Sequence, residues 1–309
     1  DLGITNTEFG LAIGIQMLGW GLSGPIFGAI ADKYGGHKAI TLAFIFYILG
    51  IYFLFNGPNT GIYFQLSLGV LIGIGCGGTA ISIPMSIVGK HFPLSNRTIA
   101  MSIVTAIGSF GYFLSPLFTN YSLENNGWVQ TLIYFMVLLI IGLIVAFFVR
   151  SPSSDHTLET PNDQNTLGAL KEAFLNKSYV LLTFGFFVCG FHITLVGTHV
   201  PKYVVDRGLD DWTAAMILSL IGLFNIFGSL LSGYLSTKMS KKIILSTIYL
   251  LRGLSICLFI FTPPSFISSI IFGASFGFLW LSTVPATSGI VAHMFGTKYL
   301  GLLYGIVFL

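Results

Sequence analysis

The sequence predicts an all-α protein that crosses a membrane many times, and three observations support this prediction. Of the 309 residues, 54% are hydrophobic and 8% are charged, and the mean hydropathy is +0.86, values too apolar for a soluble chain of this length. Apolar runs of about 20 residues, the length that crosses a hydrocarbon core, recur along the whole chain. These runs lack the alternation of barrel strands, and backbone groups in lipid need internal partners, so the runs must be helices.

The apolar runs give the order of the expected membrane helices. They lie near residues 9–30, 39–55, 62–88, 98–118, 128–149, 179–201, 213–235, 243–262 and 266–291. A further run begins near Tyr299 and stops at Leu309, and the chain opens on Asp1 rather than Met. We therefore expect a fragment, incomplete at both ends. Cys76, Cys189 and Cys257 lie inside runs, where thiols act as small packing groups, so we expect no disulfide and no metal site.

Positive charge collects on one side of the expected helices. Cytoplasmic connections carry most Lys and Arg residues in membrane proteins. The opposite side holds Lys202 and Arg207, whereas Arg252 lies inside a run. We expect a multi-pass protein of the cell's inner (plasma) membrane, with these residues on the cytoplasmic side: Lys33, Lys38, Lys90, Arg97, Arg150, Lys171, Lys177, Lys238, Lys241, Lys242 and Lys298.

One long polar segment divides the chain. It begins as a Pro-, Ser- and Asp-rich stretch and then places Leu167, Leu170, Phe174 and Leu175 at helical spacing. This spacing indicates a short helix lying on the membrane surface, and the alternative is an unstructured tether. The predicted organisation is a helical bundle over 1–150, a cytoplasmic linker over 151–177 and a second helical bundle over 178–309.

The segment GAIADKYGGHK (28–38) concentrates charge in a chain that has little of it. Aligning Gly28 with Gly233 pairs this segment with GYLSTKMSKKI (233–243), so that Lys33 meets Lys238. Each segment ends one run and turns tightly into the next. Two similar halves joined by a cytoplasmic linker are typical of transporters built from parallel repeats about an axis along the membrane normal.

The same segment resembles the G-x-x-x-D-(R/K)-x-G-(R/K)-(R/K) loop of the major facilitator superfamily, found there between the second and third helices and, degraded, between the eighth and ninth. The resemblance implies two pseudo-symmetric helical bundles, with helices two to ten and the start of eleven present and the first and last absent. GKHF (89–92), AMS (100–102), SPL (115–117) and WLSTV (280–284) are similar to signatures of the monocarboxylate and oxalate/formate branch. The implied function is secondary active transport of a small, monocarboxylate-like organic anion by alternating access.

The resemblance also implies a latch. In the superfamily such loops hold one half against the other in the outward-facing state, and this role carries over to Asp32. Gly28 permits a close helix approach, and Asp32 can meet a helix N-terminus or a lysine. The alternative, that the charges only fix topology, explains the lysines but not Asp32. The predicted latch residues are Gly28, Asp32, Lys33, Gly35, Lys38 and Lys238.

The chain departs from the family's usual charges in two places. Many proton-driven antiporters of the superfamily carry an Arg within the fourth helix, whereas residues 68–78 contain none. The branch often carries an Arg in the eighth helix, four residues after an acidic or amide side chain. Here Ser229 follows Asn225 at that spacing, so the usual anion anchor is missing from its usual place.

Arg252 supplies a positive charge elsewhere. It follows Lys242 by ten residues, which at about 1.5 Å per residue places it about 15 Å deep, near the bilayer centre. An Arg at that depth costs at least about 2.5–3.5 kcal/mol, so it needs a partner: a group outside this sequence, carbonyls near a broken helix, or a substrate anion. We expect its guanidinium, directly or through Asn225 and Ser229, to select a small organic anion. The alternative is a packing Arg satisfied by neighbouring side chains or free carbonyls.

Other polar and aromatic side chains complete the predicted substrate site. His192 lies well inside a run and is the candidate for proton coupling, because His titrates near neutral pH. Pro285 is expected to break the helix beside Trp280, and Pro116 follows Tyr112. The alternatives are aromatic packing and interhelical hydrogen bonding. The predicted substrate-binding residues are Arg252, Asn225, Ser229, His192, Trp280, Ser282, Thr283 and Tyr112.

The sequence also argues against several functions. No carboxylate lies at mid-depth, so a cation/proton antiporter or a carboxylate-built sodium site would need acidic groups outside this sequence. Catalytic motifs are absent, and we expect no enzyme activity, cofactor or metal. The alternatives to anion transport are transport of a neutral or cationic solute, drug efflux, and a non-transporting sensor, which would usually add a soluble domain. Expected partners are the bilayer, a small organic anion and a co-transported proton but no nucleic acid, and the protein is expected to be a monomer.

Overall fold

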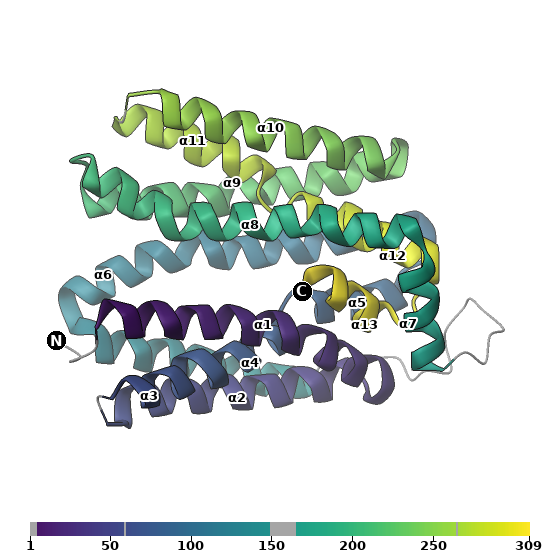
Figure 1. The fold of residues 1–309 in the computed structure, drawn as a ribbon, viewed down its shortest axis with the longest axis horizontal. Coiled ribbons are helices and arrows are strands. Elements are labelled where there is room, and N and C mark those ends of the chain that lie inside the picture. The colour runs from purple at the N-terminus through teal and green to yellow at the C-terminus, as the bar shows by residue number, and fades with distance from the viewer. Residues whose placement is uncertain (1–4, 59, 149–164, 264) are drawn as a thin grey trace. The chain divides into compact units, whose positions relative to one another are not determined.

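The computed structural model describes residues 5–58, 60–148, 165–263 and 265–309 (Figure 1). These residues contain helices and no strand, which confirms the predicted all-α class. The helices are α1 (Asn6–Tyr34), α2 (Gly36–Asn56), α3 (Gly61–Phe64), the π-helix η1 (Gln65–Ile72), α4 (Gly73–Thr79), α5 (Ser82–His91), α6 (Leu94–Phe148), α7 (Thr166–Leu175), α8 (Lys177–Asp206), α9 (Asp211–Lys238), α10 (Lys241–Phe261), α11 (Phe266–Leu279), α12 (Thr283–Phe295) and α13 (Leu300–Phe308).

The described residues include 8 helical segments long and apolar enough to cross a membrane. The predicted runs 98–118 and 128–149 correspond to the two arms of α6, which bends at Gly127, where φ is 76°. Glycine adopts this left-handed conformation without strain. The predicted helices are therefore confirmed in type and order.

Two of the predicted runs are interrupted. Within 62–88 the backbone at Ala80 is extended, with ψ of 156°, between α4 and α5. Within 266–291 the helix stops at Leu279 and resumes at Thr283. Pro285 was expected to make this break, but it lies in the first turn of α12, where its missing N–H costs no helical hydrogen bond.

By packing, the chain divides into two compact units, which are described separately. The first comprises residues 1–91, 126–183 and 295–309, and the second comprises 92–125 and 184–294. The first arm of α6 therefore groups with α9, because Gly222 lets the α9 backbone approach that of Phe113. The predicted bundles 1–150 and 178–309, which rest on sequence repeats rather than packing, stay a prediction.

In the first unit, α1 packs against α2, η1, α4, α5 and α13. Its core joins α1, α2 and α5 through small and aliphatic side chains: Phe27, Ala31, Ala39, Ala43 and Ile83. Small residues allow membrane helices to approach closely. The predicted surface helix is confirmed as a helix, α7, and the predicted tether before it lies outside the described residues.

In the second unit, α9 packs along α11, and α10 packs on α11. The core includes Ile217, Ile221, Phe276 and Trp280. Phe259 of α10 stacks on Phe272 of α11, with ring centroids 4.1 Å apart. These contacts hold the end of α11, and hence the interruption that follows it, between α9 and α10.

Candidate functional site

The first candidate feature is a capped helix start in the first unit. Asp32, near the end of α1, accepts hydrogen bonds from the backbone N–H groups of Gly301 at 3.2 Å and Leu302 at 2.8 Å, at the N-terminus of α13. Lys90 of α5 contacts the same carboxylate at 2.7 Å, and Ser86 donates to it at 3.1 Å. A carboxylate at a helix N-terminus is stabilised by the helix dipole. Asp32 therefore joins α1, α5 and α13.

Gly28 makes this arrangement possible. A Cβ at this position would overlap the backbone carbonyl of Gly301. With glycine here, α1 and α13 approach at backbone contact, one turn before Asp32. The position thus has the close-approach role expected from the sequence.

The predicted basic residues of the latch lie away from this carboxylate. Lys33 extends over the ring of Tyr34, with its Nζ 5.0 Å from the ring centroid, and Lys38 is exposed. Gly35 has a φ of 96° and makes the turn into α2. Lys238, in the second unit, is exposed over the ring of Tyr234. The partners that sequence reasoning missed are Lys90 and Ser86, although Lys90 lies in the GKHF string.

The second candidate feature is the interruption between α11 and α12, residues 280–282, which we call the α11–α12 break. A helix that stops inside a span leaves carbonyl and N–H groups without helical partners. Arg252 donates through Nη2 to the carbonyl of Leu279 at 2.6 Å and to that of Trp280. Its Nη1 donates to the Cys189 sulfur at 3.2 Å. The buried guanidinium thus caps the C-terminal end of α11, where the helix dipole is negative.

The other side of the α11–α12 break is held by α9. Asn225, fully buried, accepts a hydrogen bond from the N–H of Leu281 at 2.8 Å and donates to the Ser109 hydroxyl at 2.6 Å. Ser232 donates to the carbonyl of Ser282 at 2.5 Å. Side chains from α9 and α10 therefore satisfy the freed backbone groups. Ser232 was missed from the sequence, although it shares the helical face of Asn225, seven residues away.

The remaining predicted residues, His192 apart, divide into three groups. Thr283 bonds the Cys189 sulfur at 3.3 Å, so it joins the surroundings of Arg252. Trp280 and Tyr112 face each other, with ring centroids 5.7 Å apart. Ser229, by contrast, donates to the carbonyl of Ile226 in its own helix, and Ser282 donates to the carbonyl of Phe278 in α11, so neither bond is made with Arg252.

His192 lies on α8, a candidate membrane span, and its side chain is partly exposed. Its Nδ1 is buried and has no hydrogen-bond partner in the part of the chain that the structure describes. The Nε of Arg252 is buried and unpartnered under the same condition. One buried nitrogen of His192 and one of Arg252 are therefore without a hydrogen-bond partner among the described residues.

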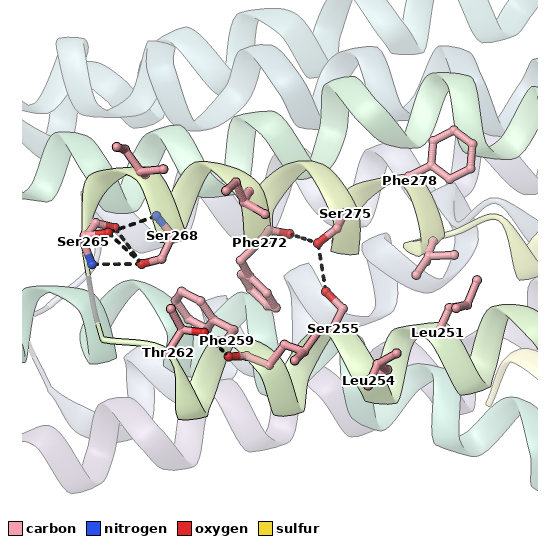
Figure 2. Close-up of a pocket in the computed structure, with 14 residues that line it drawn as sticks. Leu251, Leu254, Ser255, Phe259, Thr262, Ser265, Ser268, Phe272, Ser275 and Phe278 are labelled. Atoms are coloured by element: carbon pink, nitrogen blue, oxygen red, sulfur yellow. Dashed lines mark hydrogen bonds between the residues drawn. The ribbon is translucent and has the colours of Figure 1, made fainter.

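A groove of about 780 Å³ runs between α10 and α11 (Figure 2). Its walls are mainly leucine, isoleucine and phenylalanine side chains. Figure 2 shows Ser255 and Ser275 pointing toward each other across it, with their hydroxyls 3.0 Å apart. None of the predicted site residues lines this groove, so the candidate site is the α11–α12 break and not this cavity.

Comparison with known proteins decides the family. The family model described as Major Facilitator Superfamily matches residues 1–309. The chain belongs to the major facilitator superfamily. Its helices agree with solved structures of this fold: the Escherichia coli fucose:proton symporter FucP aligns with a TM-score of 0.76 at 15% identity, covering 98% of this chain and 81% of FucP. The human organic anion transporter MFSD10 aligns with a TM-score of 0.68 at 14% identity, covering 96% and 72%.

Curated relatives of this superfamily member are transporters. The sialic acid transporter NanX of Escherichia coli (strain K12) is 24% identical over 317 residues, covering 100% of this chain and 75% of NanX. Monocarboxylate transporter 6 of Mus musculus is 26% identical over 262 residues, covering 75% of this chain and 54% of that protein. The chain is thus a multi-pass membrane transporter that acts on small-molecule substrates, and it is not an enzyme.

Proposed function

We propose that this superfamily member moves a small, monocarboxylate-like organic anion across the membrane by alternating access. The observation that carries the proposal is Arg252, a fully buried cation whose hydrogen-bond partners are two carbonyls and a thiol. No salt bridge to Arg252 occurs among the described residues. The Tyr249 ring lies 5.5 Å from the guanidinium carbon, and carbonyls at a helix end carry roughly half an elementary charge, so no full negative charge faces Arg252 among the described residues.

An unbalanced cation favours an anionic substrate. In a site shielded from water, its electrostatic attraction for a carboxylate is stronger than at the surface. Its Nε is a donor without a partner among the residues that the structure describes, and a planar guanidinium suits a carboxylate. We infer that Arg252 acts from the α11–α12 break, which it shares with Asn225, while the Ser229 hydroxyl donates to the carbonyl of Ile226 in its own helix.

The names of the relatives point the same way. NanX is named a sialic acid transporter, and the two other proteins are named for monocarboxylates and organic anions. FucP is named a fucose:proton symporter, so the fold also carries a neutral sugar. A neutral sugar is therefore the competing substrate that the experiment must separate from a carboxylate.

Counterflow in proteoliposomes tests the proposal. Vesicles loaded with unlabelled lactate, pyruvate, fucose or a quaternary ammonium ion are diluted into trace labelled solute, and accumulation is expected only for the carboxylates. Arg252→Gln is expected to raise the carboxylate KM more than tenfold, and Arg252→Lys less, because Lys keeps the charge but loses the fork. Arg207→Gln, at an exposed arginine, is the matched control. Normal carboxylate affinity in folded Arg252→Gln protein would refute the role of Arg252.

Three further assignments accompany this proposal. Asp32, with Lys90 and the start of α13, acts as the latch that biases the outward-facing state. His192 is the residue through which a proton is co-transported. The protein works as a monomer in the inner (plasma) membrane, with its charged loops in the cytoplasm.

A further inference from the structure

Helix α7 presents an apolar face away from the protein. Leu167, Phe174 and Leu175 are 75%, 59% and 73% exposed, whereas Ala169 is 4% and Ala173 0% exposed. The helical repeat of about 3.6 residues puts the three large side chains on one face and the two alanines on the opposite face. The alanine face is buried and the opposite, apolar face is exposed, so the exposed face is the one open to another occupant.

The chain geometry places this face at the level where a membrane span begins. α7 ends at Leu175, and α8, a candidate span, begins at Lys177. Asn176 between them leaves the helical conformation, with ψ of 106°, and its side chain accepts a hydrogen bond from Ser178 N at 3.0 Å. α7 therefore turns away from the direction of α8 where that candidate span begins (Figure 1).

Charge complementarity identifies the occupant. Lys171 projects from the same face as the large apolar side chains, and Lys177 follows at the start of α8; both are exposed. A short helix with an apolar face flanked by lysines suits a headgroup layer that carries negative charge. We propose that α7 docks on anionic phospholipids of the cytoplasmic leaflet, and that this docking stabilises α13.

The link from α7 to α13 runs through Tyr179. The ring of Phe174 meets that of Tyr179 edge-on at 6.4 Å, and Tyr179 meets Phe295 at 5.3 Å. The Tyr179 hydroxyl donates to the carbonyl of Leu303 at 2.7 Å, inside α13. Tyr179 is fully buried. Because Asp32 holds the start of the same helix, lipid at α7 and the carboxylate of Asp32 act on one element.

Spin labels on single cysteines, in protein lacking the native cysteines, test the docking. The vesicles are phosphatidylcholine alone or phosphatidylcholine mixed with phosphatidylglycerol. Oxygen concentrates in lipid and an aqueous nickel chelate stays in water. Labels at Leu167→Cys and Phe174→Cys are expected to be accessible to oxygen and not to the chelate, and this preference for oxygen is expected to increase with phosphatidylglycerol. A label at Glu172→Cys, away from the apolar face, is the control and is expected to stay accessible to the chelate.

Two results would overturn the docking. If Leu167→Cys and Phe174→Cys labels are reached by the nickel chelate in both lipid mixtures, the face is in water. If they are shielded from oxygen and chelate alike, protein covers the face and the occupant is not lipid. Equal accessibilities with and without phosphatidylglycerol would refute the preference for anionic lipid.

Hydrogen exchange of residues 300–308 tests the link to α13. Phosphatidylglycerol is expected to slow exchange there severalfold, and the double variant Lys171→Gln/Lys177→Gln is expected to lose this difference. Lys202→Gln is the control, because Lys202 is exposed and is expected on the opposite side of the membrane. This variant should keep the slowing by phosphatidylglycerol. Tyr179→Phe removes the bond to Leu303 and should lose the slowing while the labels stay in lipid. Unchanged slowing in Tyr179→Phe would overturn the coupling.

Discussion

Replacing Asp32 by Asn tests whether the carboxylate holds α13 to α1. The substitution keeps the size but removes the charge and one acceptor oxygen, so that Lys90, at 2.7 Å, and Leu302 N, at 2.8 Å, lose a charged partner. Removing one partner of a buried ion pair costs about 3–5 kcal/mol. The Lys90 side chain is 17% exposed and keeps some access to water, so we expect about 2–3 kcal/mol, or roughly 30- to 150-fold in the equilibrium of the latch.

Hydrogen exchange is the assay for this latch, because the bonded amides are those of Gly301 and Leu302. Asp32→Asn should speed their exchange by the factor given above and should slow transport without abolishing substrate binding. Asp32→Asn/Lys90→Met, which leaves no unpaired ammonium, should recover part of the protection. The reasoning fails if exchange at these two amides is unchanged, or if substrate affinity collapses while turnover of bound substrate stays normal.

Three other predictions concern α8, the α11–α12 break and the start of α9. His192→Gln should make uptake less dependent on the pH gradient; unchanged dependence would place coupling elsewhere. Gly228→Ala, whose Cβ would overlap a carbonyl of α11, should cost about 1–3 kcal/mol in thermal unfolding, whereas Gly253→Ala, with open space, should not destabilise. Hydrogen bonds from Thr213 lower the pKa of Asp210, outside the spans, so its stabilisation is present above the ordinary pKa of 3.8 and is lost as pH falls through the lower folded value. Asp210→Ala removes the side chain that caps α9, so its melting temperature at pH 7 should be lower than that of Asp210→Asn, which keeps a capping oxygen. The native protein should have a higher melting temperature than Asp210→Asn at pH 7, and this difference should vanish in acid.

Much of the fold was predictable because the membrane restricts it. Apolar runs long enough to span lipid have to be helices, so their type and order followed from the sequence. The interruption at 280–282 was placed a few residues too late, at Pro285. A proline in the first turn of a helix is tolerated, so it indicated where α12 begins and not where α11 ends.

The site was only partly predictable, because its geometry depends on contacts between distant residues. The charge pattern identified Asp32 and Arg252, which are costly to bury without partners. The sequence also indicated the kinds of partner, a lysine or a helix N-terminus for Asp32 and carbonyls near a broken helix for Arg252. It did not identify Lys90 or Leu279, because lysines and carbonyls occur at many other places in the chain. The sequence likewise gave no means to tell Ser232, which reaches the α11–α12 break, from Ser229, which bonds its own helix.

The partners of Arg252 explain how one residue can serve both structure and selectivity. Two of its donors cap the end of α11, and this would hold for any transported solute. A neutral amide such as Gln also donates two hydrogen bonds, so capping alone does not require a charge. Keeping a full cation here is costly unless the charge itself is used. A substrate anion that approaches the α11–α12 break would use it, and Arg252→Gln separates the two roles because it retains donors for the cap while it removes the attraction for the anion.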